Sequence, residues 1–523
     1  MLKKSLISIV TSLIAFTAFV FFVPVSNQAY AAGDIAINAE NFPDDNFRSF
    51  VLSSYDTDSD SILSADEIGA VTQMIVYGKN IQTLKGIEHF TALTKLNCYN
   101  NKLTSLDLSY NTELTEVWCY SNKLTELDVT KCTKLDYLYC SYNNLTTLDV
   151  TKNTALESLY CEKCGLTSLD LTKNTALEYL NCKNNSLTSI DVSCNTALIK
   201  FECGMNKLTA LDVTKNTNLG YLDCHKNSLT AINLNHNPKL SYLYCHNNSL
   251  TALNLGYNTD LKELRCHFNS ISQLDLTLHT NLKDLRCYNN NLSQLDVKNN
   301  VKLERIECNN NNLTSLDLSL NEKLVYLYCY DNNLTALDVK NNTQLKYLSC
   351  ENNSISSLDL SSNSVLKSLD CSNNNLTSLD VSSNSALTSF TATDNKYSLY
   401  ASSLKLSSLS GFDPQKASGW QGCTYDAQTN TISRFTSDTI TYSYDCGNGY
   451  SMNVTIEIPY IKGDVNSDGK VDLRDVVLLF QKTSNQNVTI NEAASNVNGD
   501  NSVSIRDVVR LYQYVSDWNV ELL

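Results

Sequence analysis

Apolar and polar residues alternate with a fixed period from residue 76 to about residue 396. Each unit has the length that separates Cys98 from Cys119. Within it, a leucine or a close substitute stands two positions before a cysteine, and a leucine or isoleucine stands five positions after that cysteine. Alternation of Leu96 with Cys98 puts both side chains on one face of a short strand. The second apolar group of the unit is expected to close the core from the opposite wall and comprises Leu103, Leu106 and Leu108. A fixed period of about 20 residues predicts a solenoid, because one coil buries too little surface and must stack on its neighbours.

The cysteine column runs through fourteen units without a slip. Its members are Cys98, Cys119, Cys140, Cys161, Cys182, Cys203, Cys224, Cys245, Cys266, Cys287, Cys308, Cys329, Cys350 and Cys371. Three positions after each stands an asparagine, from Asn101 to Asn374, except where Cys164 takes its place. We expect this asparagine to be buried, with its amide satisfying backbone groups of the turn.

Buried thiols explain the cysteine column better than disulfides or a metal array. Neighbouring parallel strands lie about 4.8 Å apart with side chains pointing the same way, whereas a disulfide requires Cβ atoms about 3.8 Å apart and a near-perpendicular torsion. Cysteine also behaves as a small apolar residue in protein cores. Cys423 and Cys446 lie outside the repeats, in one small region, and could either pair or stay free.

The spacing within the unit resembles the leucine-rich repeat, in particular the repeats of internalin-like bacterial proteins. In that pattern a short strand is followed by a turn anchored by Asn or Cys, so Cys164 is a permitted substitution. The resemblance covers the whole repeat region, 76–396. It implies a repeat solenoid, a horseshoe lined by a parallel β-sheet, and it says little about function because one fold hosts many roles.

Residues 1–31 are typical of a secretory signal peptide. Lys3 and Lys4 precede an apolar run from Leu6 to Val23, and Ala29-Tyr30-Ala31 matches the cleavage motif. The run is long enough to be a membrane anchor instead, but the cleavage motif favours secretion. We therefore expect an extracellular protein with no membrane span in the mature chain.

Residues 35–75 are expected to form an EF-hand-like cap over the open N-terminal end of the solenoid. A short helix with Pro43 and Asp44 in its first turn would bury one apolar face, which comprises Phe42, Phe47, Phe50 and Val51. The loop that follows resembles an EF-hand calcium loop, with Ser61 where glycine is usual. Its expected ligands are Asp56, Asp58, Asp60, Ile62 through its carbonyl, Ser64 and Glu67. An acidic, solvated connector is the alternative.

Residues 397–460 lose the period. The runs 439–444 and 452–458 alternate apolar and polar residues as strands do. We expect a small β-rich module that seals the far end of the solenoid, similar to the β regions that follow internalin-like repeats.

Two oxygen-rich loops, which start at Asp464 and Asn496, lie in the C-terminal segment 463–523. The first predicts calcium ligands Asp464, Asn466, Asp468, Lys470 through its carbonyl, Asp472 and Asp475, with Gly469 at the sixth position. The second predicts Asn496, Asn498, Asp500, Ser502, Ser504 and Asp507. Asn496 replaces the usual first Asp and Asn501 the usual glycine, so we expect weaker calcium binding in the second loop. Similar helical runs follow the loops at 476–481 and 508–513.

This duplicated loop–helix pattern resembles a type I dockerin, the module that docks onto cohesins of a cellulosomal scaffoldin. The match covers about residues 463–518. The resemblance implies calcium as cofactor, a cohesin as partner and two nearly identical contact faces. The cohesin-facing positions would be Leu473, Arg474, Phe480 and Gln481, and in the second copy Ile505, Arg506, Tyr512 and Gln513. A calcium-stabilised tail without a partner is the alternative.

Strand positions that flank the buried residues are rich in aromatics and would face outward on the concave side. A charged stretch interrupts them at 263–307. The residues expected to bind a ligand are Trp118, Tyr120, Tyr137, Tyr139, Tyr242, Tyr244, Arg265, Arg286, Tyr326 and Tyr328. The plainer explanation is that Tyr suits strands and pairs with Tyr on the next strand. Protein is the favoured ligand and carbohydrate the rival, because tyrosine platforms can stack on sugar rings.

Histidines recur at equal offsets in three units, at His225, His246 and His267. They could hold a metal, but solvated surface histidines are favoured, since nothing in the sequence fixes their tautomers. The repeated aspartates, such as Asp107 and Asp128, are periodic and hence expected to accept turn hydrogen bonds.

The chain shows no catalytic motif and its net charge of −15 argues against a nucleic-acid binder. We therefore expect a secreted, non-catalytic interaction protein, anchored to a scaffoldin by its dockerin, whose repeats bind a partner protein. The alternatives are a carbohydrate-binding component of a polysaccharide-degrading complex and a surface adhesion protein.

Overall fold

The computed structural model describes residues 33–399, 403–433, 437, 439–458, 460–468, 470–500, 502–517 and 520–522. The predicted signal peptide and the sixth loop positions, Gly469 and Asn501, lie outside these residues.

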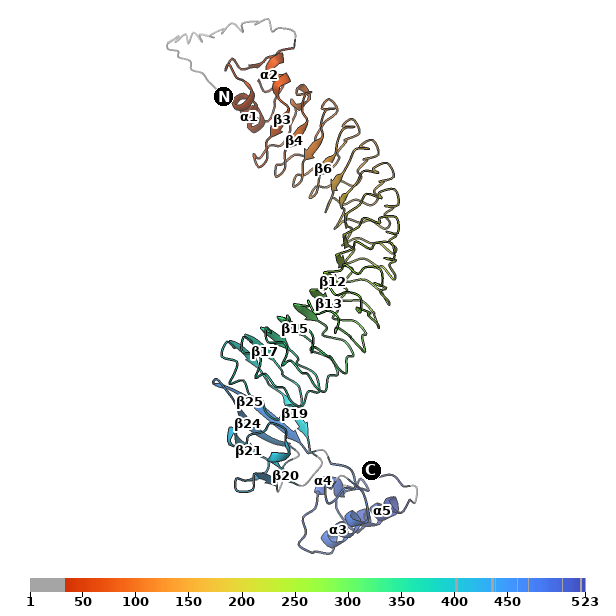
Figure 1. The fold of residues 1–523 in the computed structure, drawn as a ribbon, viewed down its shortest axis with the longest axis vertical. Coiled ribbons are helices and arrows are strands. Elements are labelled where there is room, and N and C mark those ends of the chain that lie inside the picture. Colours follow the sequence, from red (N-terminus) through yellow and green to blue (C-terminus); the bar gives the residue numbers. More distant parts are fainter. Residues whose placement is uncertain are drawn as a thin grey trace, which may run out of the picture.

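Sixteen short parallel strands form one continuous sheet in sequence order. Figure 1 shows the coils stacked into a curved arc with this sheet along its inner side. Neighbouring strands pair in register, so that Leu222 of one coil lies beside Leu243 of the next. The strands are β3 (Gln73–Ile75), β4 (Lys95–Asn97), β5 (Glu116–Trp118), β6 (Tyr137–Tyr139), β7 (Ser158–Tyr160), β8 (Tyr179–Asn181), β9 (Lys200–Glu202), β10 (Tyr221–Asp223), β11 (Tyr242–Tyr244), β12 (Glu263–Arg265), β13 (Asp284–Arg286), β14 (Arg305–Glu307), β15 (Tyr326–Tyr328), β16 (Tyr347–Ser349), β17 (Ser368–Asp370) and β18 (Ser389–Thr391). The predicted solenoid is confirmed.

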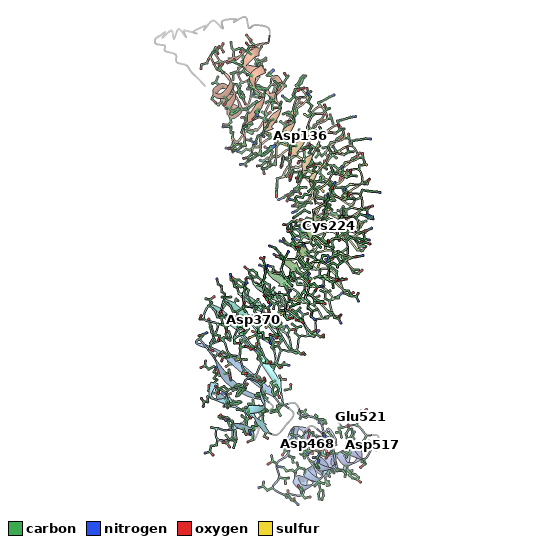
Figure 2. All side chains as sticks on the ribbon, in the orientation of Figure 1. Asp136, Cys224, Asp370, Asp468, Asp517 and Glu521 are labelled. Carbon is green, nitrogen blue, oxygen red and sulfur yellow. The ribbon has the colours of Figure 1, made fainter. Side chains whose placement is uncertain are left out.

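The ladder cysteines lie inside this stack. All fourteen are buried free thiols, and Figure 2 labels one of them, Cys224, midway along the arc. Burial raises the pKa of the Cys98 thiol to about 12, so the ladder stays protonated and unreactive at neutral pH. The expectation of core thiols is confirmed, and Cys423 and Cys446 are also free.

The asparagine that follows each ladder cysteine joins adjacent coils. The Asn122 side-chain oxygen accepts from the Leu103 N–H at 3.0 Å, and its amide donates to the carbonyls of Cys98 and Cys119, both at 3.0 Å. Cys164, in the same slot, donates its thiol to the Cys140 carbonyl at 3.2 Å. Periodic aspartates accept turn hydrogen bonds as expected; Asp107 accepts from the Ser109 N–H at 2.9 Å.

A second buried asparagine column runs through the turns on the far side of the coils. Asn300 is fully buried and donates to the carbonyls of Leu276 and His279 at 3.0 and 2.9 Å. Cys132 and His279 take this slot in two coils and also reach carbonyls of the preceding coil. The sequence pattern contains this column, but its role as a second seam between coils was not predicted.

The N-terminal cap covers the first coil. Helix α1 (Asp45–Tyr55) begins after its N-cap Asp44, so Pro43 and Asp44 precede the helix and do not lie in its first turn. Phe42 packs on Phe90 of the solenoid, with ring centroids 6.4 Å apart. Strand β1 (Ile35–Ala36) pairs with β2 (Ile62–Leu63), and helix α2 (Ala65–Ala70) and the 3₁₀ turn η1 (Ile87–His89) complete this end.

Two small sheets follow the last coil. One joins β19 (Asn395–Ser398), β25 (Tyr450–Glu457), β24 (Thr439–Gly447) and β21 (Ala417–Gln421); the other joins β20 (Ser403–Lys405), β23 (Thr431–Ser433) and β22 (Thr424–Asp426). The 3₁₀ turns are η2 (Leu406–Ser408) and η3 (Pro414–Lys416). The Tyr442 hydroxyl donates to the Thr377 carbonyl at 2.6 Å, which ties this module to the end of the solenoid.

The C-terminal segment contains three helices, α3 (Leu473–Thr483), α4 (Glu492–Ser495) and α5 (Ile505–Val515). Its core is small and repeats with the same spacing as the two loops: Val465, Val476 and Leu479 are matched by Val497, Val508 and Leu511. Among the described residues, no helix is long and apolar enough to cross a bilayer.

Candidate functional site

The first C-terminal loop gathers its predicted side chains around the start of α3. Asp475 is fully buried, and its two oxygens accept from the N–H groups of Asn466 and Asp472, both at 2.9 Å. Asp464 is also buried, and it accepts from the Asp468 N–H at 3.0 Å. Helix α3 therefore starts inside the loop, and backbone N–H groups of the loop fix the Asp475 carboxylate.

The second loop repeats this construction. Asp507 is fully buried and accepts from the N–H groups of Val497 and Ser504, both at 2.9 Å. Asn498 accepts from the Asp500 N–H at 2.9 Å, and Ser504 caps helix α5. Loop two thus repeats the hydrogen bonds of loop one at Asn498, Asp500, Ser504 and Asp507, whereas Asn496 accepts from the Gly499 N–H at 3.2 Å.

Both loops suit a hard divalent cation. Calcium takes six to eight oxygen ligands, several of them carboxylates, and the donors here are oxygens only. A carboxylate buried without a cation is costly, and Asp475 and Asp507 are both fully buried. The residues therefore fit calcium, with more negative charge in loop one, where Asp464 stands in place of Asn496.

Large apolar side chains remain exposed on both helices. Leu473 and Phe480 on α3 are 56% and 51% exposed, and their counterparts Ile505 and Tyr512 on α5 are 53% and 48% exposed. Arg474 and Arg506 are both exposed; Arg474 pairs with Asp472 at 2.6 Å, and Arg506 lies 4.0 Å from Asp500. Gln481 and Gln513 are half-buried.

Val477 and Val509 belong to the same two faces and were missed from the sequence. They are 54% and 51% exposed and lie one helical turn after Leu473 and Ile505. The spacing of Leu473, Val477 and Phe480, at i, i+4 and i+7, defines one stripe on a helix and could have revealed them. Exposed apolar stripes of this kind are typical of interaction surfaces.

The N-terminal loop brings together three of its predicted ligands. One carboxylate oxygen from each of Asp56, Asp58 and Asp60 lies within 4.8 Å of the others. Ser61, in the glycine position, adopts the left-handed φ of +67° that the turn requires. Ile62 lies in β2 and Ser64 caps α2. Glu67 accepts from the Thr57 and Ser64 N–H groups at 2.6 and 2.9 Å, and also from the Thr57 hydroxyl. These hydrogen bonds, of which that from the Thr57 hydroxyl contributes most, lower the pKa of Glu67 to about 2.

The concave face carries the aromatic residues that the strand pattern predicts. Stacked ladders run across neighbouring coils: Tyr99 lies 4.4 Å from Tyr120, Tyr139 lies 4.3 Å from Tyr160, and Tyr326 lies 4.8 Å from Tyr347, all nearly parallel. Each residue predicted to bind a ligand lies on this face and is partly exposed: Trp118, Tyr120, Tyr137, Tyr139, Tyr242, Tyr244, Arg265, Arg286, Tyr326 and Tyr328.

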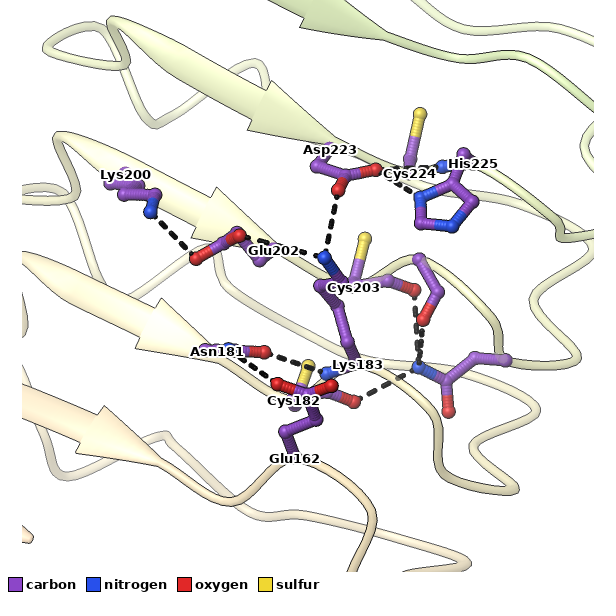
Figure 3. A network of polar contacts seen from close by, with 12 residues as sticks. Glu162, Asn181, Cys182, Lys183, Lys200, Glu202, Cys203, Asp223, Cys224 and His225 are labelled. Carbon is purple, nitrogen blue, oxygen red and sulfur yellow. Dashed lines mark hydrogen bonds and ion pairs between the residues drawn. The ribbon is translucent and has the colours of Figure 1, made fainter. Parts of the chain in front are cut away.

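Ion pairs occupy the middle of this face. Figure 3 shows Lys183 between Glu202 and Asp223, at 3.7 and 3.3 Å, and His225 2.5 Å from Asp223. Further along, Arg265 pairs with Glu263, and Arg286 and Arg305 both lie within 4 Å of Asp284 and Glu307. Since these side chains compensate one another, Arg265 and Arg286 are less available to a ligand than the sequence suggested.

The histidine column differs from the solvated surface residues that were expected. His225, His246 and His267 stack at 4.6 and 4.3 Å, and His267 is only 7% exposed. Burial lowers the pKa of His246 to about 3 and that of His267 to about 4. The prediction was wrong because each ring is covered by the ring in the next coil. Parallel rings also point their nitrogens side by side rather than at one metal position.

The chain is similar to known proteins in two separate regions. Residues 462–516 match the family model of the dockerin type I domain. The solved functional domain of InlJ from Listeria monocytogenes, described as including a cysteine ladder, is 33% identical, with a TM-score of 0.72, over 82% of this chain and 99% of that one. A leucine-rich repeat protein of Leptospira interrogans has a TM-score of 0.53 at 21% identity, over 60% of this chain and 92% of that one, which supports the fold alone.

A curated relative matches over a shorter stretch. Internalin J of Listeria monocytogenes serotype 4b is 34% identical over 88 residues, which is 17% of this chain. That stretch spans about a tenth of the relative's length.

Proposed function

The chain belongs to the internalin-like leucine-rich repeat proteins and carries a type I dockerin domain, and from this premise we propose that it is an extracellular, non-catalytic binding component. Its dockerin attaches it to a cohesin of a cellulosomal scaffoldin. Its repeats present a concave face to a partner protein. The observation that carries the proposal is the pair of matched, exposed apolar stripes on α3 and α5.

The two stripes support a partner-binding role for the C-terminal domain. A domain whose described core cluster contains six buried apolar residues keeps Leu473, Val477 and Phe480 exposed on one helix and their three counterparts on the other. Surfaces of this kind are stabilised by burial against another protein. Because the stripes occupy equivalent positions in the two loop–helix copies, either could face the cohesin while the other stays in solvent.

Calcium is proposed for both C-terminal loops. When bound, it would neutralise the buried carboxylates of Asp475 and Asp507, each of which also accepts hydrogen bonds at the start of its helix. The ion would thereby fix where each helix starts and how its exposed stripe is presented. For the N-terminal loop we propose calcium held by Asp56, Asp58 and Asp60. Glu67 caps helix α2 beside this loop.

The geometry of the concave aromatics favours a protein ligand over a polysaccharide. Sugar rings bind to exposed faces of aromatic rings, but stacking covers both faces of Tyr99 and one face each of Tyr120, Tyr139 and Tyr160. Much of what these rings present is therefore edges and hydroxyl groups. Such edges suit the mixed polar and apolar surface of a protein.

The anchoring role is tested by cohesin binding of the full-length protein with changes in the two stripes. We expect Phe480→Ala and Tyr512→Ala each to change affinity less than about threefold, because the other face remains. The double variant should lose at least about 100-fold, as for a central interface residue. The exposed Tyr110→Ala, in the solenoid, is the matched control. Equal affinity of the double variant and the unchanged protein would refute the proposed contact faces.

A further inference from the structure

A hollow of about 330 Å³ opens on the concave side of the solenoid, beyond the central ion pairs. It is lined by Tyr288, Glu307, Asn309, Tyr328, Tyr330 and Ser349. These residues come from four consecutive coils, at the carboxyl ends of their strands and just beyond them. The hollow is separate from the dockerin loops and from the predicted metal loop of the cap.

The hollow exists because a short residue interrupts an aromatic column. Tyr288, Asn309 and Tyr330 occupy the same position in three successive coils, directly after the ladder cysteine. In some other coils this position carries stacked rings, as in Tyr77, Tyr99 and Tyr120, which lie 4.7 and 4.4 Å apart. With Asn309 between them, Tyr288 and Tyr330 stand two coils apart, about 9 to 10 Å along the sheet. The shorter Asn309 side chain, only 4% exposed, forms the floor of the slot between the two rings.

One wall of the slot is held in place. Tyr288 stacks on buried His267 at 4.2 Å, with the ring planes 11° apart, and its edge meets Phe268. The stack extends through His246 to His225. The histidine column therefore orients Tyr288 and covers one of its faces, so that the slot lies beside the other face.

The surroundings of the slot are negatively charged. Glu307 is held by Arg305 at 2.9 Å, so its charge is compensated. The next four coils, however, place Asp331, Glu351, Asp370 and Asp394 at or just beyond the same end of the strands. In these coils no lysine or arginine stands in the four-residue segments around this end, which are 328–331, 349–352, 370–373 and 391–394. Ser349, which lines the hollow, donates to Glu351 at 2.5 Å. Burial and the neighbouring Asp370 and Asp331 raise the pKa of Glu351, as expected where negative charge is uncompensated.

Elsewhere on the concave face, the protein covers its own tyrosines with cations. The Arg265 guanidinium lies 4.3 Å from the Tyr244 ring centroid, and that of Arg305 lies 3.8 Å from Tyr326. Within the described chain, no lysine or arginine lies over the rings of Tyr288, Tyr328 or Tyr330. These three rings have the setting for a cation–π contact, and the cation has to come from outside.

We propose that the slot between Tyr288 and Tyr330 binds an arginine side chain of the protein that occupies the concave face. Arginine fits better than lysine because its guanidinium is planar and stacks on aromatic rings. The surrounding carboxylates then favour further basic residues beside it. The inference rests on the proposed protein-binding role of the repeats and specifies the charge of the partner's contact segment.

The test uses the full-length protein and a fluorescent peptide of glycine, serine and three arginines, compared with lysine and citrulline versions of the same peptide. Anisotropy titrations at low salt should rank arginine above lysine, and citrulline should bind at least about tenfold more weakly, since it keeps the shape and loses the charge. Failure of the arginine peptide to bind, or equal binding of the citrulline peptide, overturns the proposal.

Two variants locate the binding. Asn309→Tyr fills the slot with a ring that this column already accepts in neighbouring coils, and should weaken arginine-peptide binding at least about tenfold; Tyr330→Ala should weaken it about fivefold. Tyr137→Ala, on a distant strand of the same face, is the control and should have no effect. If Asn309→Tyr binds as well as the unchanged protein, or Tyr137→Ala loses as much, the slot is not the site. Neither result involves cohesin, so the proposed anchoring is judged independently.

Discussion

The solenoid and the dockerin are both built by repetition, but they use it in opposite ways. In the solenoid, most of what repeats in nearly every coil is buried or half-buried, namely the leucines, the cysteine ladder and the two asparagine columns, although the repeated turn aspartates are exposed. Much of what varies faces the concave side. In the dockerin, the repeated residues include the exposed stripes on α3 and α5. Repetition therefore marks the core in one region and marks the proposed contact surface in the other.

The two regions also differ in what stabilises them. The solenoid core continues from the cap to the β module as one apolar cluster. The dockerin core contains six buried apolar residues in two matched sets, beside two fully buried carboxylates. A domain with so small a core usually needs a metal or a similar cross-link. We therefore expect the dockerin fold to depend on metal, whereas in the solenoid only the proposed calcium loop of the N-terminal cap would respond to metal removal.

The largest effect is expected from changing the buried carboxylates. Asp475→Asn with Asp507→Asn keeps the side-chain size but removes a charge from each loop, so calcium affinity should fall at least about tenfold per loop. Cohesin binding should then be lost at micromolar calcium, while the main thermal transition of the solenoid stays unchanged. Calcium titration calorimetry and differential scanning calorimetry measure the two effects.

Asp359→Asn is the control for this pair, since Asp359 is an exposed turn acceptor in the solenoid. A double variant that keeps its calcium affinity and its cohesin binding would show that these carboxylates are not the ligands.

The next effect concerns the seam between coils. Asn300→Ala removes one of two donors from each of the buried carbonyls of Leu276 and His279, which keep the backbone N–H groups of His279 and Leu282, so the expected loss is about 0.5 to 1.5 kcal/mol per hydrogen bond. Asn299→Ala removes an exposed hydrogen bond at the adjacent position and should cost less than about 0.5 kcal/mol. Denaturant unfolding of both variants makes the comparison, and equal losses would contradict the assigned role of the second asparagine column.

The smallest predicted effect is a pH dependence of the solenoid. His246 and His267 stay neutral in the folded protein down to pKa values of about 3 and 4, whereas an unfolded histidine takes up a proton near pH 6.5. Because the unfolded state binds more protons, stability should be full above about pH 7, should fall by about 1 to 2 kcal/mol by pH 6, and should fall further as the pH drops towards 4. Thermal unfolding from pH 7 to 4 measures this loss.

Replacing His246 and His267 by tyrosine should make the dependence of stability on pH flatter. Tyrosine suits this position because the next coil already has it there, in Tyr288. Carboxylates contribute to the acid loss in both proteins, so the difference between the two profiles is the informative quantity. Identical profiles would mean that the histidines titrate as freely in the fold as in the unfolded chain.

The sequence pattern predicts most of the solenoid because each core position is set by period and residue type. It fails where a side chain's role depends on the neighbouring coil. His267 looks like a surface residue in its own unit and is buried only by the rings beside it. The same holds for Asn300, whose hydrogen-bond partners come from the coil before it.

The candidate sites show the same limit. Ligand spacing identifies the calcium loops, but it does not show that Glu67, like Asp475 and Asp507, also caps a helix. Family resemblance supplies Leu473 and Phe480, whereas Val477 becomes visible only as part of an exposed helical stripe. The slot at Asn309 depends on three coils together and has no signature within a single repeat.

The most direct test of the account is a calorimetric titration of the full-length protein with a purified type I cohesin, first in millimolar calcium and then in excess EDTA. The account predicts that one cohesin binds per chain in calcium, and that binding disappears in EDTA and returns when calcium is restored. Undiminished cohesin affinity in EDTA would contradict it.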